Sequence, residues 1–233
     1  MKYPKLLLPL MLVCANVWSG CISAGADAKH NFDSCFREAK QDDARAQKDL
    51  GNLYTQGLGV AVNHEQAVSW YRKAAEQGNL DAIYNLGVMY DKGNGVTKDT
   101  KQAAAWYRKA ADQGDALAQY NLAVMYEYGE GVTQDYGQAL ALYQKAAEQG
   151  QSVAQFSMGL MYEKGLGVPR DPVTAYMWWD ITGVGHKHAI YNRDSLAEEL
   201  KPAQIEEAQQ RAVAWRAARP QLLPPTPWNA RAN

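Results

Sequence analysis

The stretch YNLGVMYDKGNGV at residues 84–96, followed by QAAAWYRKAADQG at residues 102–114, decides the fold of this chain. Both strings return 36 residues later as YNLAVMYEYGEGV and QALALYQKAAEQG. When residues 80–115 are aligned with residues 116–151, 21 of the 36 positions are identical. A fixed period of this length is typical of solenoids, in which each unit buries its apolar face only against its neighbours. The sequence therefore predicts a repeat protein, a class whose members usually bind rather than catalyse.

Each repeat unit is expected to form two helices. Within one unit, apolar side chains recur at helical spacing over residues 82–90 and again over residues 103–111. Gly93 and Gly95 lie between the two helices, and Gly114 follows the second. Because glycine takes positive φ at no steric cost, the glycine pair predicts a turn that reverses the chain, and Gly114 predicts a helix end. The unit is therefore a predicted helical hairpin.

Small and aromatic residues alternate along the predicted helices. Alanine lets two helix backbones approach closely, whereas large aromatic rings fill the remaining space. We therefore expect the aromatic columns to form the core rather than a cofactor site. The alanine column is Ala67, Ala103, Ala139 and Ala175, and the aromatic columns are Trp70, Trp106, Leu142 and Trp178, then Tyr71, Tyr107, Tyr143 and Trp179, then Tyr54, Tyr90, Tyr126 and Tyr162.

These columns closely resemble the Sel-one-like repeat, a relative of the tetratricopeptide repeat, over roughly residues 43–218. The resemblance is carried by the two strings at residues 84–96 and 102–114, in which several columns agree at once. It implies an all-α fold, namely a right-handed α/α superhelical solenoid of antiparallel helix hairpins with 36-residue repeats. It also implies a concave groove that is used for protein partners, but it does not imply a particular ligand.

The repeat register divides the chain into segments. We expect a signal peptide at 1–28, one solenoid domain at 29–219, and a tail at 220–233 whose prolines prevent further helix. The terminal units of a solenoid are atypical because their outer faces meet water. Inside the domain we expect a cap at 30–42, repeats at about 43–79, 80–115, 116–151 and 152–187, and C-terminal capping helices at 188–218, with helix over 193–200 and 201–216.

The N-terminal segment predicts export. Lys2 and Lys5 precede an apolar run at residues 6–13, and small residues follow as far as Ala26-Asp27-Ala28, which fits an Ala-x-Ala cleavage site. A rival interpretation makes Ser19-Gly20-Cys21 a lipobox, so that the lipoprotein signal ends before Cys21 and that cysteine is lipidated. We therefore expect a periplasmic protein or, alternatively, one that is lipid-anchored to the outer membrane.

Cysteine content predicts stability from packing alone. Cleavage after Ala28 would leave Cys35 as the one remaining cysteine, so no intrachain disulfide is expected. This departs from the cysteine-rich members of the resembled family, in which a disulfide staples each repeat. Because Cys35 aligns with the Tyr71 column, we expect it to be a small buried apolar residue.

Charge and motifs argue against several functional classes. The formal net charge is −1 and no basic stripe is present, so nucleic acid is not an expected partner. The sequence contains no HExxH, CxxC or P-loop pattern. His186 and His188 are two residues apart and would not share a helix face, which makes them a poor metal pair. We therefore expect no catalytic residue, metal or cofactor.

One face of the first helix in each hairpin predicts a binding surface. If residues 82, 86, 89 and 90 face the core, residues 84, 88 and 91 lie on another face. In tetratricopeptide-like solenoids that face lines the concave groove. The projected groove has three rows: Lys48, Tyr84, Tyr120 and Phe156; Asn52, Val88, Val124 and Leu160; Thr55, Asp91, Glu127 and Glu163.

This surface has two interpretations. An aromatic row, an apolar row and an acidic edge suit a peptide or a helix of another protein. Alternatively, Tyr84, Tyr120 and Phe156 are further packing residues of the repeat.

Two functional hypotheses remain. The first is a non-enzymatic interaction module that binds a toxin, an effector or an envelope protein; the resemblance implies an immunity protein, an envelope regulator or a scaffold. The second is a hydrolase acting on β-lactam or cell-wall substrates. Ser34 is followed by Arg37 where a Ser-x-x-Lys acylating motif requires lysine, which favours the first hypothesis.

Overall fold

The computed structural model describes residues 21–22, 27–183 and 185–222. Over these residues the protein is all-α, with eleven α-helices, one short 3₁₀ turn and no strand. The predicted signal segment up to residue 20 and the tail from residue 223 onward lie outside the described residues. Consecutive helices pack on one another up to the tenth, and the eleventh packs on the ninth, so the predicted solenoid of helix hairpins is confirmed.

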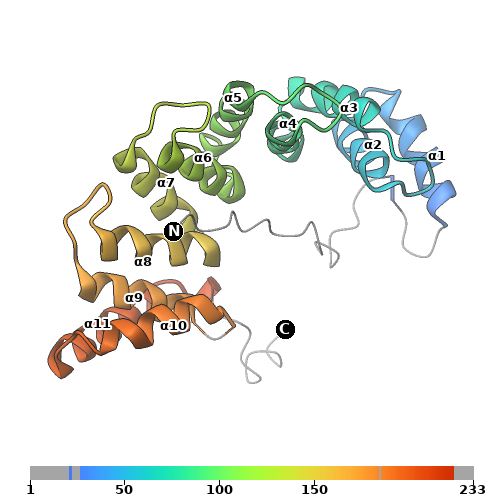
Figure 1. The fold of residues 1–233 in the computed structure, drawn as a ribbon. Helices are drawn as coiled ribbons and strands as arrows, with labels where there is room; N and C mark the ends of the chain where they lie inside the picture. The colour runs from blue at the N-terminus through green and yellow to red at the C-terminus, as the bar shows by residue number, and fades with distance from the viewer. Residues whose placement is uncertain (1–20, 23–26, 184, 223–233) are drawn as a thin grey trace, which may run out of the picture.

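The helices form an arch in which α4 and α6 lie toward the inner side and α3 and α5 toward the outer side (Figure 1). The hairpins are α2 with α3, α4 with α5, α6 with α7, and α8 with α9. The elements are α1 (Ala28–Ala39), α2 (Ala44–Gln56), α3 (His64–Glu76), α4 (Leu80–Lys92), α5 (Thr100–Ala111), α6 (Ala116–Tyr128), α7 (Tyr136–Glu148), α8 (Ser152–Lys164), α9 (Pro172–Thr182), α10 (Lys187–Ala197), α11 (Pro202–Ala217) and η1 (Pro220–Leu222).

The ends of the helices follow from local sequence. Helix α4 begins after Asn79, whose side chain accepts a hydrogen bond from the backbone N–H of Ala82, and it ends at Gly93 with φ +73°. A short polar side chain before the helix and a left-handed glycine after it satisfy backbone groups that the helix leaves unpaired. Helices α2, α6 and α8 end in the same way at Gly57, Gly129 and Gly165.

The second glycine of each loop joins neighbouring repeats. Gly95 has φ +70°, and a Cβ atom there would overlap the backbone carbonyl of His64, the first residue of α3. The loop backbone therefore rests directly on the start of the preceding outer helix. The same contact recurs for Gly59 on Ala28, Gly131 on Thr100 and Gly167 on Tyr136.

The predicted aromatic core is confirmed for one column, in which Tyr71, Tyr107, Tyr143 and Trp179 are all buried. In the other two columns, two residues are buried, Trp70 and Trp178, and the rest are only partly buried and pack against the core: Trp106, Leu142, Tyr54, Tyr90, Tyr126 and Tyr162. Three rings of the buried column lie against a glycine inside the facing helix, an arrangement that the sequence analysis did not predict. A Cβ on Gly87 would lie 2.6 Å from the Tyr107 ring; Gly51 faces Tyr71 and Gly159 faces Trp179 in the same way.

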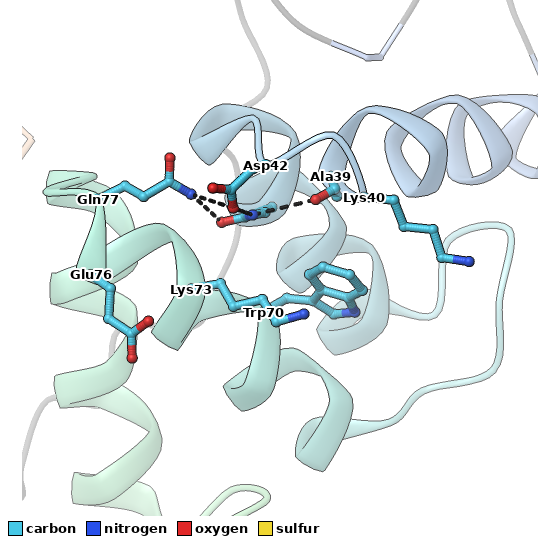
Figure 2. Close-up of a pocket in the computed structure, with 8 residues that line it drawn as sticks. Ala39, Lys40, Asp42, Trp70, Lys73, Glu76 and Gln77 are labelled. Atoms are coloured by element: carbon cyan, nitrogen blue, oxygen red, sulfur yellow. Dashed lines mark hydrogen bonds between the residues drawn. The ribbon is translucent and has the colours of Figure 1, made fainter.

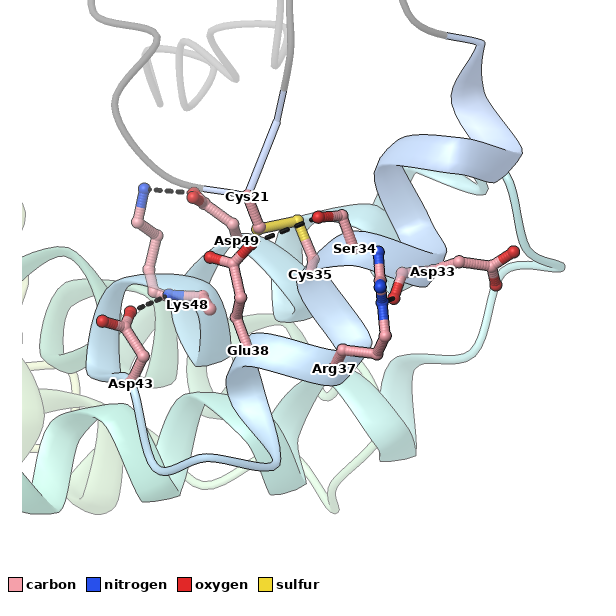
Figure 3. Close-up of a disulfide and its surroundings, with 10 residues drawn as sticks. Cys21, Asp33, Ser34, Cys35, Arg37, Glu38, Asp43, Lys48 and Asp49 are labelled. Atoms are coloured by element: carbon pink, nitrogen blue, oxygen red, sulfur yellow. Dashed lines mark hydrogen bonds and ion pairs between the residues drawn. A yellow bond between two sulfur atoms is a disulfide. The ribbon is translucent and has the colours of Figure 1, made fainter.

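The N-terminal cap contains a disulfide that the sequence analysis wrongly excluded. Cys21 is bonded to Cys35 of α1, with a Cα–Cα distance of 4.6 Å (Figure 3). Cys35 is fully buried, as expected, but as half of a disulfide rather than as a free thiol. The disulfide uses the same Cys21 sulfur that the rival lipobox interpretation would lipidate, so the two interpretations of Cys21 exclude one another.

The first C-terminal capping helix begins earlier in the chain than the sequence suggested. Helix α10 begins at Lys187 rather than at residue 193, because the His186 Nδ1 atom accepts a hydrogen bond from the backbone N–H of Ala189. Helix α11 packs on α9, where the Trp178 and Trp215 rings meet edge to face at 5.7 Å. These helices cover the apolar face that a further repeat would otherwise cover.

Candidate functional site

The twelve residues of the predicted groove lie on α2, α4, α6 and α8, the first helices of the four hairpins. All twelve are partly exposed, neither buried nor fully open to solvent. Figure 1 places α4 and α6 toward the inner side of the arch. We call these residues the inner surface; they are Lys48, Asn52, Thr55, Tyr84, Val88, Asp91, Tyr120, Val124, Glu127, Phe156, Leu160 and Glu163.

The aromatic row both packs and remains accessible. The Tyr84 ring lies 5.8 Å from the Tyr107 ring, and the Tyr120 ring lies 5.7 Å from the Tyr143 ring. Phe156 instead stacks on His186, with ring centroids 4.7 Å apart. The two interpretations of this row are therefore compatible: one side of each ring contacts a neighbouring ring, and the partly exposed remainder is available to a ligand.

Asparagine side chains connect the inner helices of successive repeats. Asn121 on α6 donates a hydrogen bond of 3.3 Å to the Tyr84 hydroxyl on α4. Asn85 on α4 donates one of 3.4 Å to Asn52 on α2, which also accepts a 2.7 Å bond from the Tyr71 hydroxyl. The sequence analysis missed Asn85 and Asn121, although their 36-residue spacing within the repeated Tyr-Asn-Leu string was a visible signal.

The acidic edge differs from repeat to repeat. The Tyr143 hydroxyl donates a 2.6 Å hydrogen bond to the Glu127 carboxylate. Near the N-terminal end, Lys48 pairs with Asp49 at 2.6 Å and with Asp81 at 3.7 Å, so its positive charge is offset locally. Burial raises the pKa of Asp49 despite this lysine. The inner surface therefore carries one acidic group on each of α4, α6 and α8, and its one lysine, on α2, is already paired.

Burial of the core tyrosines predicts a loss of stability in alkali. Burial raises the pKa of Tyr71 from 10.0 to about 12. The pKa of Tyr143 is raised well above 10, chiefly by burial and in addition by the negative charge of Glu127. The unfolded chain therefore ionises first, so this contribution is complete below pH 10 and decreases as pH rises toward 12. Each such tyrosine should lower the free energy of unfolding by about 1.4 kcal/mol per pH unit in that window.

Urea unfolding across this pH range measures the effect. Tyr143→Phe keeps the ring but removes one ionisable group, so its stability should fall less steeply with pH than that of the unmodified protein. Equal slopes for the two proteins would contradict the prediction.

A depression at the cap is not a comparable ligand site. It has a volume of about 600 Å³ and lies between the end of α1 and the end of α3 (Figure 2). Three of its polar side chains are already hydrogen-bonded: Gln77 donates to Gln47 at 2.9 Å and to Asp42 at 3.2 Å, and Gln47 donates to the Ala39 carbonyl at 3.3 Å. These bonds attach the cap to the first repeat.

Among the described residues, no group of three or more histidine, cysteine, aspartate or glutamate side chains is placed to hold a metal ion. The His186 and His188 rings are 6.3 Å apart. No helix in the described ranges is both long enough and apolar enough to cross a membrane.

Comparison with known families agrees with this architecture. The Sel1 repeat matches residues 44–79, 80–115, 116–151 and 152–181. The chain belongs to the Sel1 repeat family. Sel1 repeats are protein-interaction modules, and Sel1 repeat proteins are generally non-enzymatic scaffolds that bind other proteins.

Two solved structures of Sel1 type are similar. A Sel1 repeat protein from Oxalobacter formigenes is 34% identical with a TM-score of 0.69, and the match covers 80% of this chain and 77% of that one. A protective antigen of uropathogenic Escherichia coli with an SLR fold is 32% identical with a TM-score of 0.55; the match covers 86% of this chain but only 52% of the antigen. Among curated proteins, none matches this chain.

Proposed function

We propose that this Sel1 repeat protein binds a protein partner along its inner surface in the bacterial periplasm and catalyses no reaction itself. The observation that carries the proposal is the uniform partial exposure of that surface on the first helices of four consecutive hairpins. A single site would concentrate its groups in one place, whereas this surface repeats the same kind of position in every unit. Such a surface suits an elongated ligand that contacts several repeats at once.

The chemistry of the surface indicates what the partner presents. Tyr84, Tyr120 and Phe156 offer aromatic contacts, and Val88, Val124 and Leu160 offer apolar ones. Asp91, Glu127 and Glu163 add negative charge. The complementary ligand is a helix or extended segment with apolar anchors and basic side chains, because such a segment matches both the apolar rows and the acidic edge.

The periplasmic location is supported by two features. Lys2, Lys5 and the apolar run at residues 6–13 have the composition of an export signal. The Cys21–Cys35 disulfide belongs to an oxidising compartment, since thiols in the cytosol are kept reduced. Within that compartment, the partner is either a secreted toxin, which would make this an immunity protein, or an envelope protein under regulation or assembly. A secreted effector encoded next to this chain would favour immunity.

Charge reversal on the inner surface tests the proposal. Asp91→Lys combined with Glu163→Lys should reduce capture of the partner from periplasmic extract by about tenfold or more, because two attractive contacts of ~1 kcal/mol each become repulsive. Neither carboxylate is needed for the Tyr143–Glu127 hydrogen bond, so the fold should persist. Affinity capture followed by mass spectrometry measures the amount of partner bound.

The matched control reverses two charges on the outer helices. Glu76 at the end of α3 and Asp112 after α5 are exposed, and replacing both by lysine gives the same change in net charge. This control should capture the partner as well as the unmodified protein does. Equal capture by the inner and outer variants would refute the inner surface as the binding site, and capture of no protein above background would refute the proposed function.

A further inference from the structure

The first described residues of the chain belong to the folded core. Cys21 is only 2% exposed, and Ile22 packs against the cluster formed by Phe32, Cys35 and the first repeat. The disulfide to Cys35 spans 14 positions of sequence and fixes this segment to helix α1. A mature protein that begins at Lys29 would lack all of these contacts.

The predicted cleavage point after Ala28 also lies inside a structured junction. The Asp27 carboxylate accepts a 2.7 Å hydrogen bond from the backbone N–H of His30 and caps α1. Gly59 lies so close to the Ala28 carbonyl that a Cβ atom there would overlap it. Cleavage after Ala28 would remove the cap and leave a positively charged amine at the positive end of the helix dipole.

We propose that the export signal is instead removed by hydrolysis of the Ser19–Gly20 peptide bond, so that the mature chain begins at Gly20 and keeps Cys21. Signal peptidases select small side chains at the last and third-last positions of the signal, and Ser19 and Val17 satisfy this requirement. Water adds across the bond, leaving a carboxylate on Ser19 and a free amine on Gly20. This inference rests on the proposed export of the chain.

Disulfide formation completes the maturation. The thiols of Cys21 and Cys35 together lose two electrons and two protons to a thiol-disulfide oxidoreductase of the envelope, whose own disulfide becomes a dithiol. A lipid anchor would require the same Cys21 sulfur as a thioether. The disulfide and the anchor therefore exclude one another, and the structure assigns Cys21 to the disulfide.

Analysis of the processed protein tests the inference. The full chain is expressed in a bacterium, recovered from the periplasm, sequenced from its N-terminus and weighed intact with and without reduction. The expected product begins at Gly20, carries no lipid, and takes up a thiol-alkylating reagent at Cys21 and Cys35 only after reduction. A product that begins at Lys29, or one with a lipidated Cys21, would overturn the inference while leaving export intact. An uncleaved chain retained in the cytoplasm would overturn export as well.

Two pairs of variants sharpen the test. Ser19→Leu should block processing, whereas Ala28→Leu should not; the opposite result would restore the cleavage site after Ala28. Cys35→Ser should lower the melting temperature by roughly 5–10 °C, because the disulfide between residues 14 positions apart no longer restricts the unfolded chain. Cys14→Ser is the matched control and should leave the processed protein unchanged, because Cys14 precedes Ser19. A melting temperature unaffected by Cys35→Ser would contradict the disulfide.

Discussion

Gly95→Ala is expected to destabilise the protein by about 3 kcal/mol or more, although it adds a single methyl group. The left-handed backbone of Gly95, with φ +70°, should cost an alanine about 1–2 kcal/mol. The added Cβ would also overlap the His64 carbonyl, and forced overlap of this kind typically costs about 1–3 kcal/mol. The neighbouring atom belongs to the backbone, so it cannot rotate away, and the junction between two repeats must open instead.

Gly114→Ala separates the two contributions. Gly114 also has a left-handed backbone, with φ +93°, but no atom lies within 4 Å of the position its Cβ would take. This control should therefore cost only about 1–2 kcal/mol, the conformational penalty alone. Urea unfolding followed by circular dichroism measures both variants. If Gly95→Ala and Gly114→Ala lowered the free energy of unfolding equally, the contact between the loop and the preceding helix would not contribute to stability.

Gly159→Leu should have a comparable effect at the core between α8 and α9. A Cβ on Gly159 would overlap the Trp179 indole, whose N–H donates a 3.2 Å hydrogen bond to the Phe156 carbonyl. Leucine must therefore displace a buried tryptophan and break its hydrogen bond, which should cost about 3 kcal/mol or more. Chemical unfolding gives the loss of stability, and tryptophan fluorescence reports whether the indole has become exposed.

Gly137→Leu is the corresponding control. Gly137 is an exposed residue near the start of α7, and the nearest atom to its Cβ position is an Asp135 oxygen at 3.3 Å. Leucine favours helix over glycine by up to about 1 kcal/mol, so this variant should be neutral or slightly more stable. A large loss from Gly137→Leu, or none from Gly159→Leu, would show that the ring-on-glycine contact does not govern stability.

Periodicity predicted the hairpins well because it records the same packing requirement in every unit. The alanine and aromatic columns identified the core residues, and the Gly93–Gly95 pair identified the turn. The role of Gly93 was predicted, but the role of Gly95 was not. Gly93 ends a helix through its own backbone conformation, which is a local property, whereas Gly95 is required by His64, which lies in the preceding repeat. A contact with a distant residue leaves no local pattern.

The disulfide could not be predicted because the cleavage motif was interpreted without the fold. Ala26-Asp27-Ala28 has suitable small residues, but Asp27 is also a good helix-capping residue, and the structure gives it that position. The assumed cleavage after Ala28 excluded Cys21 from the mature protein, and Cys21 is the disulfide partner of Cys35. The place of Cys35 in a buried column was predicted correctly, yet burial alone does not distinguish a thiol from a disulfide.

The inner surface was predicted from helical geometry alone. Helical spacing placed Tyr84 and Tyr120 on one face, and both are partly exposed. The bonds from Asn121 to Tyr84 and from Asn85 to Asn52 depend on how successive hairpins are rotated against one another. That rotation is set by packing between repeats, so the sequence of one unit does not reveal it.

The contact between each loop glycine and the start of the preceding outer helix has a consequence for how such proteins change in evolution. Because the junction is the same at Gly59, Gly95, Gly131 and Gly167, duplicating or deleting one unit creates no new kind of junction. The arch can therefore be lengthened or shortened in whole steps. The length of elongated ligand that the protein can contact then depends on the number of repeats. Unequal recombination can change that number without altering the core of any repeat.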